Sequence, residues 1–171
     1  MNKISDLKDV FVCELNFSGK DVKGRKKLNY TIFIDFLCPY CGKFHFEHGN
    51  QLKRLLDKGY INIKLVPLAW IDFYSNGFYY SVRSAHAAKI IYENQPEVLW
   101  DFIELILKKG VQPKEAEHYN ESDGSNETLA KNAKKVGANK SVVNYILQID
   151  PNDDFGKRLL AESKSLIRSN M

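Results

Sequence analysis

The N-terminal part of the chain alternates hydrophobic and polar residues in short runs that are typical of β-strands. These runs predict strands over residues 9–16, 28–36 and 60–68. Between the second and third runs, apolar residues recur at helical spacing over residues 39–58, and Gly59 is a suitable stop for that helix. A strand, a helix and a strand with this spacing form a βαβ unit, so the second and third strands should be parallel neighbours with a right-handed crossover. We expect the first strand to join the same sheet.

The hydrophobic pattern becomes helical from about residue 75 onwards. It predicts four helices over residues 82–92, 96–106, 127–136 and 141–149, and a fifth over residues 155–167 that is capped by Asp150-Pro151. The polar stretch 117–126 is typical of an exposed loop. The sequence thus predicts an α/β protein with a strand-rich part at 1–72, a helical insertion at 73–150 and a helix at 151–171 that leads back to the first part.

In the predicted helix at 39–58, we expect one stripe of apolar residues to face the core. Its members are Phe44, Leu52, Leu55 and Leu56. This stripe would hold the helix against the predicted sheet, with the N-terminal end of the helix at the edge where the second strand finishes.

Composition and charge narrow the classes of function. The 171 residues are 44% hydrophobic and 27% charged, as expected for an ordinary globular domain. The net charge of +4 is too small to indicate nucleic-acid binding, and we interpret the basic run at 20–27 as a solvated turn. No stretch is apolar enough to span a membrane, and residues 1–6 lack the apolar core of a signal peptide. We therefore expect either a cytoplasmic protein or one whose leader has been removed.

The strongest chemical signal is Cys38-Pro39-Tyr40-Cys41, which follows the second predicted strand and opens the helix. Two cysteines separated by two residues at such a junction are typical of a thiol–disulfide redox site. Unpaired backbone N–H groups and the helix dipole at a helix N-terminus stabilise a thiolate, here that of Cys38. Pro39 suits the first helical turn, and Cys41 lies one turn inside, within reach of a short disulfide.

The third cysteine, Cys13, falls in the first predicted strand, and we interpret it as a buried apolar thiol. With one close pair and no framework of further cysteines, a disulfide in this chain would serve chemistry and would not hold the fold together.

The run 33–41 resembles the active-site segment of DsbA-like thiol–disulfide oxidoreductases, which are thioredoxin folds with a helical domain inserted. The resemblance continues through Leu65-Val66-Pro67-Leu68 and Ser84-Ala85-His86-Ala87-Ala88 and covers roughly residues 28–170. It implies that Cys38 and Cys41 are catalytic, that Pro39 and Tyr40 are the active-site dipeptide, and that no cofactor or metal is needed. It also implies protein substrates with thiols or disulfides, a redox recycling partner and an extracytoplasmic location, with the cytoplasm as the alternative.

Two residues depart from the pattern of this family. Members often carry an acidic residue six positions before the first cysteine, and this chain has Ile32 there. Asp35 does match the family, but strand alternation places it on the opposite face from Ile32, so it is no simple substitute. Strongly oxidising members often have His where this chain has Tyr40, and a neutral phenol stabilises a thiolate less well. We therefore expect a less oxidising pair.

The sequence pattern predicts no counterpart for the last part of the thioredoxin fold. Such folds continue with a cis-proline loop, two strands and a closing helix, whereas no convincing strand follows Pro96, Pro113 or Pro151, and Pro67 ends the third predicted strand. We expect the C-terminal strands to be missing, which would leave an open sheet edge. That edge would favour self-association, or the chain would be a fragment of a longer protein.

Three alternative functions remain open at this point. A zinc site is the first, because cysteine and histidine are common zinc ligands and the chain has Cys38, Cys41, His45 and His48 close together. However, all four residues lie near one end of a single helix. The same dithiol segment occurs in glutaredoxins, which would make the protein a glutathione-linked reductase, but those are compact and lack a helical insertion. A non-catalytic thioredoxin-fold binding module would explain the missing C-terminal strands and would not explain the intact cysteine pair.

Overall fold

The structure, a computed structural model, describes residues 11–16, 27–74, 78–113 and 124–168. Its elements in chain order are β1 (Cys13–Leu15), β2 (Leu28–Asp35), α1 (Pro39–Asp57), β3 (Ile61–Leu68), η2 (Ile71–Tyr74), α2 (Tyr80–Asn94), η3 (Pro96–Val98), α3 (Leu99–Ile106), α4 (Asn126–Lys135), α5 (Lys140–Leu147) and α6 (Asp154–Arg168). The predicted helices and strands are confirmed, apart from shifts of a few residues at their ends. Most of the basic run at 20–27 and of the polar stretch 117–126 lies outside the described residues.

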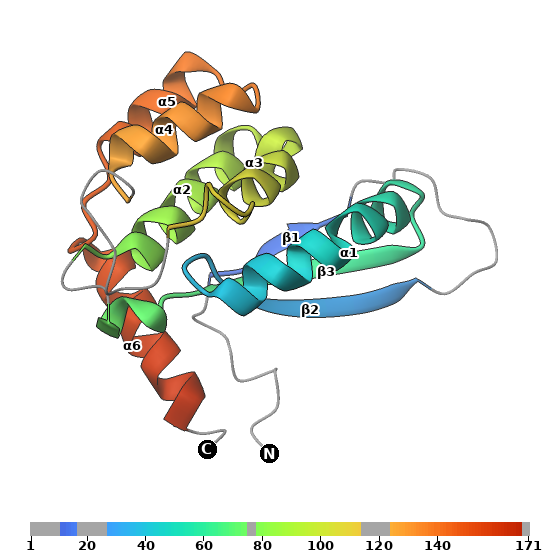
Figure 1. The fold of residues 1–171 in the computed structure, drawn as a ribbon, viewed down its shortest axis with the longest axis horizontal. Helices are drawn as coiled ribbons and strands as arrows, with labels where there is room; N and C mark the ends of the chain where they lie inside the picture. The colour runs from blue at the N-terminus through green and yellow to red at the C-terminus, as the bar shows by residue number, and fades with distance from the viewer. Residues whose placement is uncertain (1–10, 17–26, 75–77, 114–123, 169–171) are drawn as a thin grey trace.

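The sheet has three strands in the order β1-β3-β2. β2 and β3 are parallel, with a register that runs from Leu28 opposite Ile61 to Asp35 opposite Leu68. β1 is antiparallel to β3 and pairs Cys13 with Leu65. The predicted βαβ unit is therefore confirmed, and α1 is its crossover helix (Figure 1). In the described part of the chain no strand follows β3, and β2 pairs with β3 alone.

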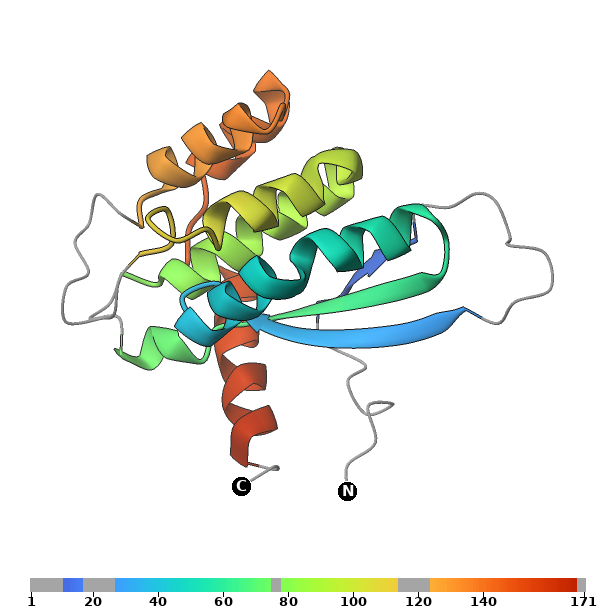
Figure 2. The same cartoon turned by 45° about the vertical axis from the view of Figure 1, so that its right-hand side comes forward.

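The other helices are stacked on one side of this unit. Figures 1 and 2 show α2 and α3 between the α1 layer and the α4–α5 pair, whereas α6 extends in the opposite direction past the end of the sheet. Small residues of α2 allow close packing, since Ala85, Ala87 and Ala88 are fully buried. The largest buried side chains include Trp100 and Phe102 of α3. The core thus lies between the sheet and the helices α1 to α3.

One expectation for α1 is wrong. Leu56 is fully buried and Leu52 and Leu55 pack against the core, but Phe44 keeps 43% of its surface exposed. Phe44 shares a helix face with His48, and their ring centroids are 5.1 Å apart. Its face of α1 borders a groove beside β2, because no described element covers that side of the helix.

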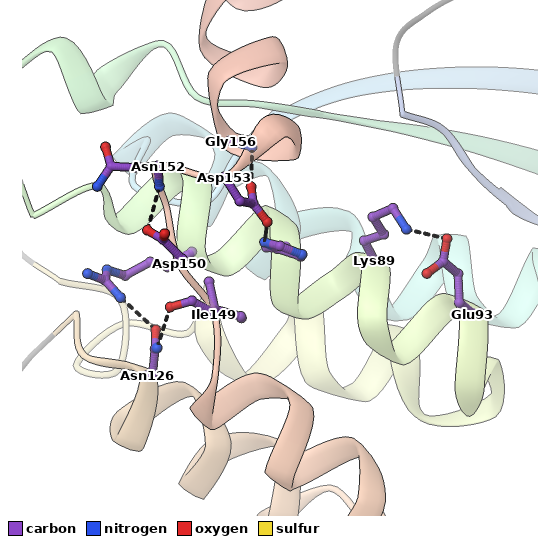
Figure 3. A network of polar contacts seen from close by, with 10 residues as sticks. Lys89, Glu93, Asn126, Ile149, Asp150, Asn152, Asp153 and Gly156 are labelled. Atoms are coloured by element: carbon purple, nitrogen blue, oxygen red, sulfur yellow. Dashed lines mark hydrogen bonds and ion pairs between the residues drawn. The ribbon is translucent and has the colours of Figure 1, made fainter.

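The expected cap of the last helix is also wrong. Asp150 accepts a hydrogen bond from the backbone N–H of Asn152, which forms a local turn, and α6 starts only at Asp154. The carboxylate of Asp153 caps it instead by accepting from the N–H of Gly156 over 2.8 Å. Figure 3 shows this contact between Asp153 and Gly156. The other carboxylate oxygen of Asp153 lies 3.7 Å from Nδ1 of His86 in α2. The His86 ring also packs on Phe155, with ring centroids 4.6 Å apart.

Candidate active site

Cys38 lies where β2 passes into α1. The backbone N–H of Cys38 donates to the Asp35 carbonyl over 3.0 Å, which turns the chain from the strand into the helix. Cys38 is the N-cap residue of α1, with φ −72° and ψ 119°, and Pro39 follows in the first turn. The Cys38 side chain makes no capping hydrogen bond. It therefore stands at a helix end whose first backbone N–H groups have no partner within the helix.

Cys41 lies one turn further along α1 and contacts Cys38. Both cysteines are free thiols and half-buried, and the Cys41 thiol is hydrogen-bonded to Cys38. Burial raises the pKa of Cys41 to about 12; the nearby Cys38 adds to this rise, and a hydrogen bond with the Asp35 backbone opposes it. Pro39 is exposed and Tyr40 keeps 80% of its surface exposed, so the dipeptide between the cysteines faces solvent. The two thiols are thus in contact, and the dipeptide between them is open to solvent.

A buried pair of carboxyl groups supports the segment before Cys38. Asp35 accepts hydrogen bonds from the N–H of Leu37 over 2.9 Å, from the N–H of Ile71 over 2.9 Å and from the hydroxyl of Ser81 over 2.6 Å. Burial raises the pKa of Asp35, and the hydrogen bonds it accepts oppose this rise. The carboxyl group of Asp35 is therefore committed to the backbone around the end of β2, and its side chain anchors the turn that leads to Cys38.

The second carboxyl group, Asp72, fixes the start of α2. It accepts from the backbone N–H groups of Ser81 over 2.8 Å and Val82 over 2.7 Å, which are among those that α2 itself leaves unpaired. Burial raises the pKa of Asp72 to about 6, and the charge of Asp35 adds to the rise. Ser81 thus joins the two acids, through its hydroxyl to Asp35 and through its N–H to Asp72.

The segment that follows α3 also reaches the turn. The side-chain amide of Gln112 donates to the carbonyl of Phe36 and to the carbonyl of Cys38, each over 2.9 Å. Gly42, in the first turn of α1, makes room for this side chain, because a Cβ there would lie 2.5 Å from Oε1 of Gln112. The backbone of residues 36–38 is therefore held by hydrogen bonds to two side chains, Asp35 and Gln112.

A largely apolar groove of about 760 Å³ opens beside the cysteines, between β2 and α1. Its lining includes Cys41 and Tyr40 at one end and exposed aromatic residues along its length, namely Tyr30 and Phe33 of β2 and Phe44 of α1. A groove with this lining suits an extended apolar segment of another molecule.

The four residues of the zinc alternative do not come together. His45 is buried and lies against Trp100, with ring centroids 5.2 Å apart, whereas His48 is exposed beside Phe44. Among the described residues, no group of three or more His, Cys, Asp or Glu side chains is arranged to hold a metal ion. Burial also lowers the pKa of His45 to about 4. The arrangement offers the two cysteines as a pair and not as part of a four-ligand site.

Cys13 lies apart from this pair, in β1. It is 1% exposed, and burial raises its pKa to about 12. A thiol in this environment is protonated and shielded. The interpretation of Cys13 as a buried apolar thiol is therefore confirmed. None of the described helices combines the length and apolar character that crossing a membrane requires.

A central βαβ unit with a dithiol at the start of its helix, and further helices stacked on it, defines a protein of the thioredoxin fold. The family model described as thioredoxin matches residues 25–153, and this chain belongs to that family. No curated protein matches the chain in sequence.

Solved structures have the same fold at low sequence identity. The chain is similar to oxidised DsbA of Mycobacterium tuberculosis (22% identity, TM-score 0.73, covering 92% of this chain and 78% of that one). It is similar to reduced DsbG of Mycobacterium tuberculosis (23% identity, TM-score 0.70, covering 94% of this chain and 73% of that one). It is also similar to the thiol-disulfide oxidoreductase MdbA of Corynebacterium diphtheriae (22% identity, TM-score 0.65, covering 98% of this chain and 85% of that one). The DsbA-like thioredoxin fold implied by the resemblance is thereby confirmed.

Several residues around the cysteines were not predicted from the sequence. Asp72, Ser81 and Gln112 lie far along the chain from Cys38, and no motif connects them to it. One signal was present: Gly42 sits inside a helix, where glycine is less favourable than alanine by about 1 kcal/mol, so it marks a place where another group comes close. The identity of that group, Gln112, required the fold.

Proposed function

We propose that this protein is a thiol–disulfide oxidoreductase that exchanges disulfides with protein substrates through a Cys38–Cys41 redox pair. The observation that carries the proposal is the contact between two free thiols at the N-terminus of α1, with Cys38 at the helix end. A thiolate is the nucleophile in exchange, and this position favours one at Cys38. Proteins of similar structure that are named thiol-disulfide oxidoreductases support the same class.

In the oxidising direction, a substrate thiolate attacks the sulfur of Cys38 in the Cys38–Cys41 disulfide. The bond between the two cysteines breaks, Cys41 leaves and takes up a proton, and a mixed disulfide links Cys38 to the substrate. A second substrate thiolate then attacks the substrate sulfur of that mixed disulfide and displaces Cys38. The substrate loses two electrons and gains a disulfide, and the pair ends as two thiols, which a recycling partner reoxidises.

The reducing direction uses the same atoms in reverse order. Cys38 attacks a substrate disulfide, and Cys41 then resolves the mixed disulfide once it has lost its proton. The high pKa of Cys41 makes this second step the slower one near neutral pH. Unfolded or partly folded proteins are the substrates we propose, with apolar segments lying over Tyr40 and the groove between β2 and α1. We propose an extracytoplasmic compartment, as the resemblance implies, and self-association through the open edge of β2.

The proposal is tested by equilibrating the purified protein with glutathione buffers of graded redox ratio and mapping disulfides by mass spectrometry. We expect a Cys38–Cys41 disulfide in the wild type and in Cys13→Ser. In Cys41→Ser, we expect a stable mixed disulfide of glutathione with Cys38, and in Cys38→Ser no exchange. A wild-type protein that forms no intramolecular disulfide at any ratio would leave the non-catalytic binding module as the better reading.

The zinc and glutaredoxin alternatives give different results in companion measurements. Stoichiometric zinc in protein purified without chelator, lost on His45→Ala, would favour the metal site. Faster turnover of glutathionylated peptides than of protein disulfides would favour a glutaredoxin-type reductase. We expect neither result, because His45 packs against Trp100 and the apolar groove suits a peptide chain.

A further inference from the structure

We infer that Gln112 is a positioning residue for Cys38: its side-chain amide fixes the turn before α1 and thereby sets the redox equilibrium of the cysteine pair. The inference rests on the proposed redox function of that pair and adds to it a residue from a distant segment. Gln112 lies 74 residues beyond Cys38 in the chain and touches the turn only because the segment after α3 folds back over the start of α1.

The contacts of Gln112 are specific for an amide donor. Its Nε2 donates to two carbonyls, those of Phe36 and Cys38, at 2.9 Å each. The Cys38 carbonyl also accepts the N–H of Gly42 over 3.1 Å, which is the first helical hydrogen bond of α1. Gln112 therefore binds the carbonyl that defines the start of the helix. Neither a carboxylate nor an aliphatic side chain of the same length could make these two bonds.

Two backbone N–H groups of the turn have partners as well. The N–H of Leu37 donates to the Asp35 carboxylate and the N–H of Cys38 to the Asp35 carbonyl. Asp35 holds the N–H groups of the turn, whereas Gln112 holds its carbonyls. Without Gln112, the carbonyl of Phe36 would lose this partner, and the turn would be free to shift relative to α1.

The orientation of this turn matters for the chemistry of Cys38. A thiolate at a helix N-terminus is stabilised by the fixed direction of the nearby N–H groups and of the helix dipole. A turn held in one orientation keeps the Cys38 sulfur close to these N–H groups. Stabilisation of the thiolate in turn favours the reduced form of the cysteine pair. Loss of the amide should therefore stabilise the disulfide, and a negative charge at the same place should do so more strongly.

Gly42 supplies an independent check on the geometry. A Cβ at Gly42 would lie 2.5 Å from Oε1 of Gln112 and 3.0 Å from the carbonyl oxygen of Leu107. Gly42→Ala should consequently push the Gln112 side chain off its two carbonyls. The Leu107 contact is the same whether or not Gln112 is present, so it cancels when Gly42→Ala is compared in the two backgrounds.

The experiment measures the equilibrium constant for reduction of the pair by glutathione, and the alkylation rate of Cys38 in the reduced protein. We expect Gln112→Ala to lower both about threefold and Gln112→Glu to lower both about tenfold, since a charged group interacts more strongly than a neutral one. Gln148→Glu adds the same charge at an exposed position on the far helices and should change neither value. Gly42→Ala should act like Gln112→Ala, and in the Gln112→Ala background it should add little.

Unchanged values in both Gln112 variants, or fully additive effects of Gly42→Ala and Gln112→Ala, would overturn the inference. Circular dichroism at the working temperature tests whether each variant is folded. If Gln112→Ala is unfolded, Gln112→Met, which keeps the side-chain length, takes its place. The alkylation rate tests Gln112 even in a protein without exchange activity. A wild type that forms no Cys38–Cys41 disulfide would contradict the proposed function, whereas an active wild type with indifferent Gln112 variants would contradict only this inference.

Discussion

His45 lies against Trp100 inside the protein, with ring centroids 5.2 Å apart, and neither His45 Nε2 nor Trp100 Nε1 has a hydrogen-bond partner among the described residues. A histidine in this environment is tolerated only as the neutral imidazole, because protonation would bury an unpaired charge. Burial accordingly lowers its pKa from 6.5 to about 4. The burial of this imidazole beside Trp100 therefore makes folding sensitive to acid.

We predict that His45 causes a loss of stability as the pH falls from about 6.5 to about 4. In that interval the unfolded state binds a proton at His45 and the folded state does not, so stability rises with pH and is lost on acidification. The shift corresponds to about 3 kcal/mol at most. Urea unfolding of the wild type and of His45→Phe at pH 7 and pH 4 measures the effect, because titration of the other groups is common to both proteins.

The matched control is His48→Phe, at an exposed position one turn further along α1. It should keep the acid-dependent loss of the wild type, whereas His45→Phe should remove most of it. Equal pH dependence in the wild type and in His45→Phe would show that His45 is not held neutral by the fold.

Cys41 should limit the reducing direction through its high pKa. Well below a pKa of about 12, the thiolate fraction of Cys41 rises about tenfold for each pH unit. Release of glutathione from a preformed Cys38–glutathione mixed disulfide, followed by mass spectrometry, should therefore accelerate about tenfold per unit between pH 7 and pH 9. Cys13→Ser should leave this profile unchanged. A rate that levels off below pH 9 would mean that Cys41 loses its proton far more easily than its burial implies.

Asp35 should contribute to stability through the hydrogen bonds it accepts. Asp35→Ala leaves the N–H groups of Leu37 and Ile71 and the hydroxyl of Ser81 without that acceptor. A buried donor without a partner costs about 1–3 kcal/mol, and relief from burying the acid offsets part of the total, so we expect the free energy of unfolding to fall by about 3 kcal/mol. Denaturant unfolding measures it. Asp101→Ala, at an exposed acid of α3, should change it by less than about 0.5 kcal/mol, and a similar loss there would argue against the network.

The strands and helices were predictable because they depend on local pattern. The sequence itself shows the alternation in β2 and β3 and the glycine that ends α1. In the structure this residue, Gly59, has the positive φ of 72° that such a helix end requires. Side-chain partners were harder to predict. Asp150 and Asp153 are equally plausible caps within one acidic stretch, and only the structure shows that Asp153 caps α6 and also lies beside His86 of α2. The exposure of Phe44 depends on which side of α1 stays uncovered, which periodicity does not specify.

The site was predictable only in part, for the same reason. The dithiol and its place at the helix start follow from residues 30–41 alone, whereas the groups that hold the turn come from three later segments. Ser81 reaches Asp35 across 46 positions, and Gln112 reaches Phe36 across 76. Such contacts exist only once the helices have packed on the βαβ unit, and the sequence marks them by no more than the glycine at position 42.

The open edge of β2 gives a final prediction, on self-association. Among the described residues β2 pairs with β3 alone, and its exposed side chains include Leu28, Tyr30 and Phe33, which are 61%, 44% and 41% exposed. An unpaired strand edge with apolar side chains is a template for a second strand, and a second copy of the chain offers the same edge. We therefore expect the mass from light scattering to rise with concentration from 19.7 kDa toward twice that value.

A charge on the edge should suppress this association. Phe33→Lys places a charge on β2 and should keep the protein monomeric, because lysine on an edge strand disfavours pairing. Phe46→Lys makes the same substitution at an aromatic residue of α1 that is 81% exposed and does not line the groove beside β2, so the association should persist. A wild-type protein that stays monomeric at every concentration would show that the edge is protected in another way, and equal effects of the two substitutions would show that net charge, and not the edge, controls association.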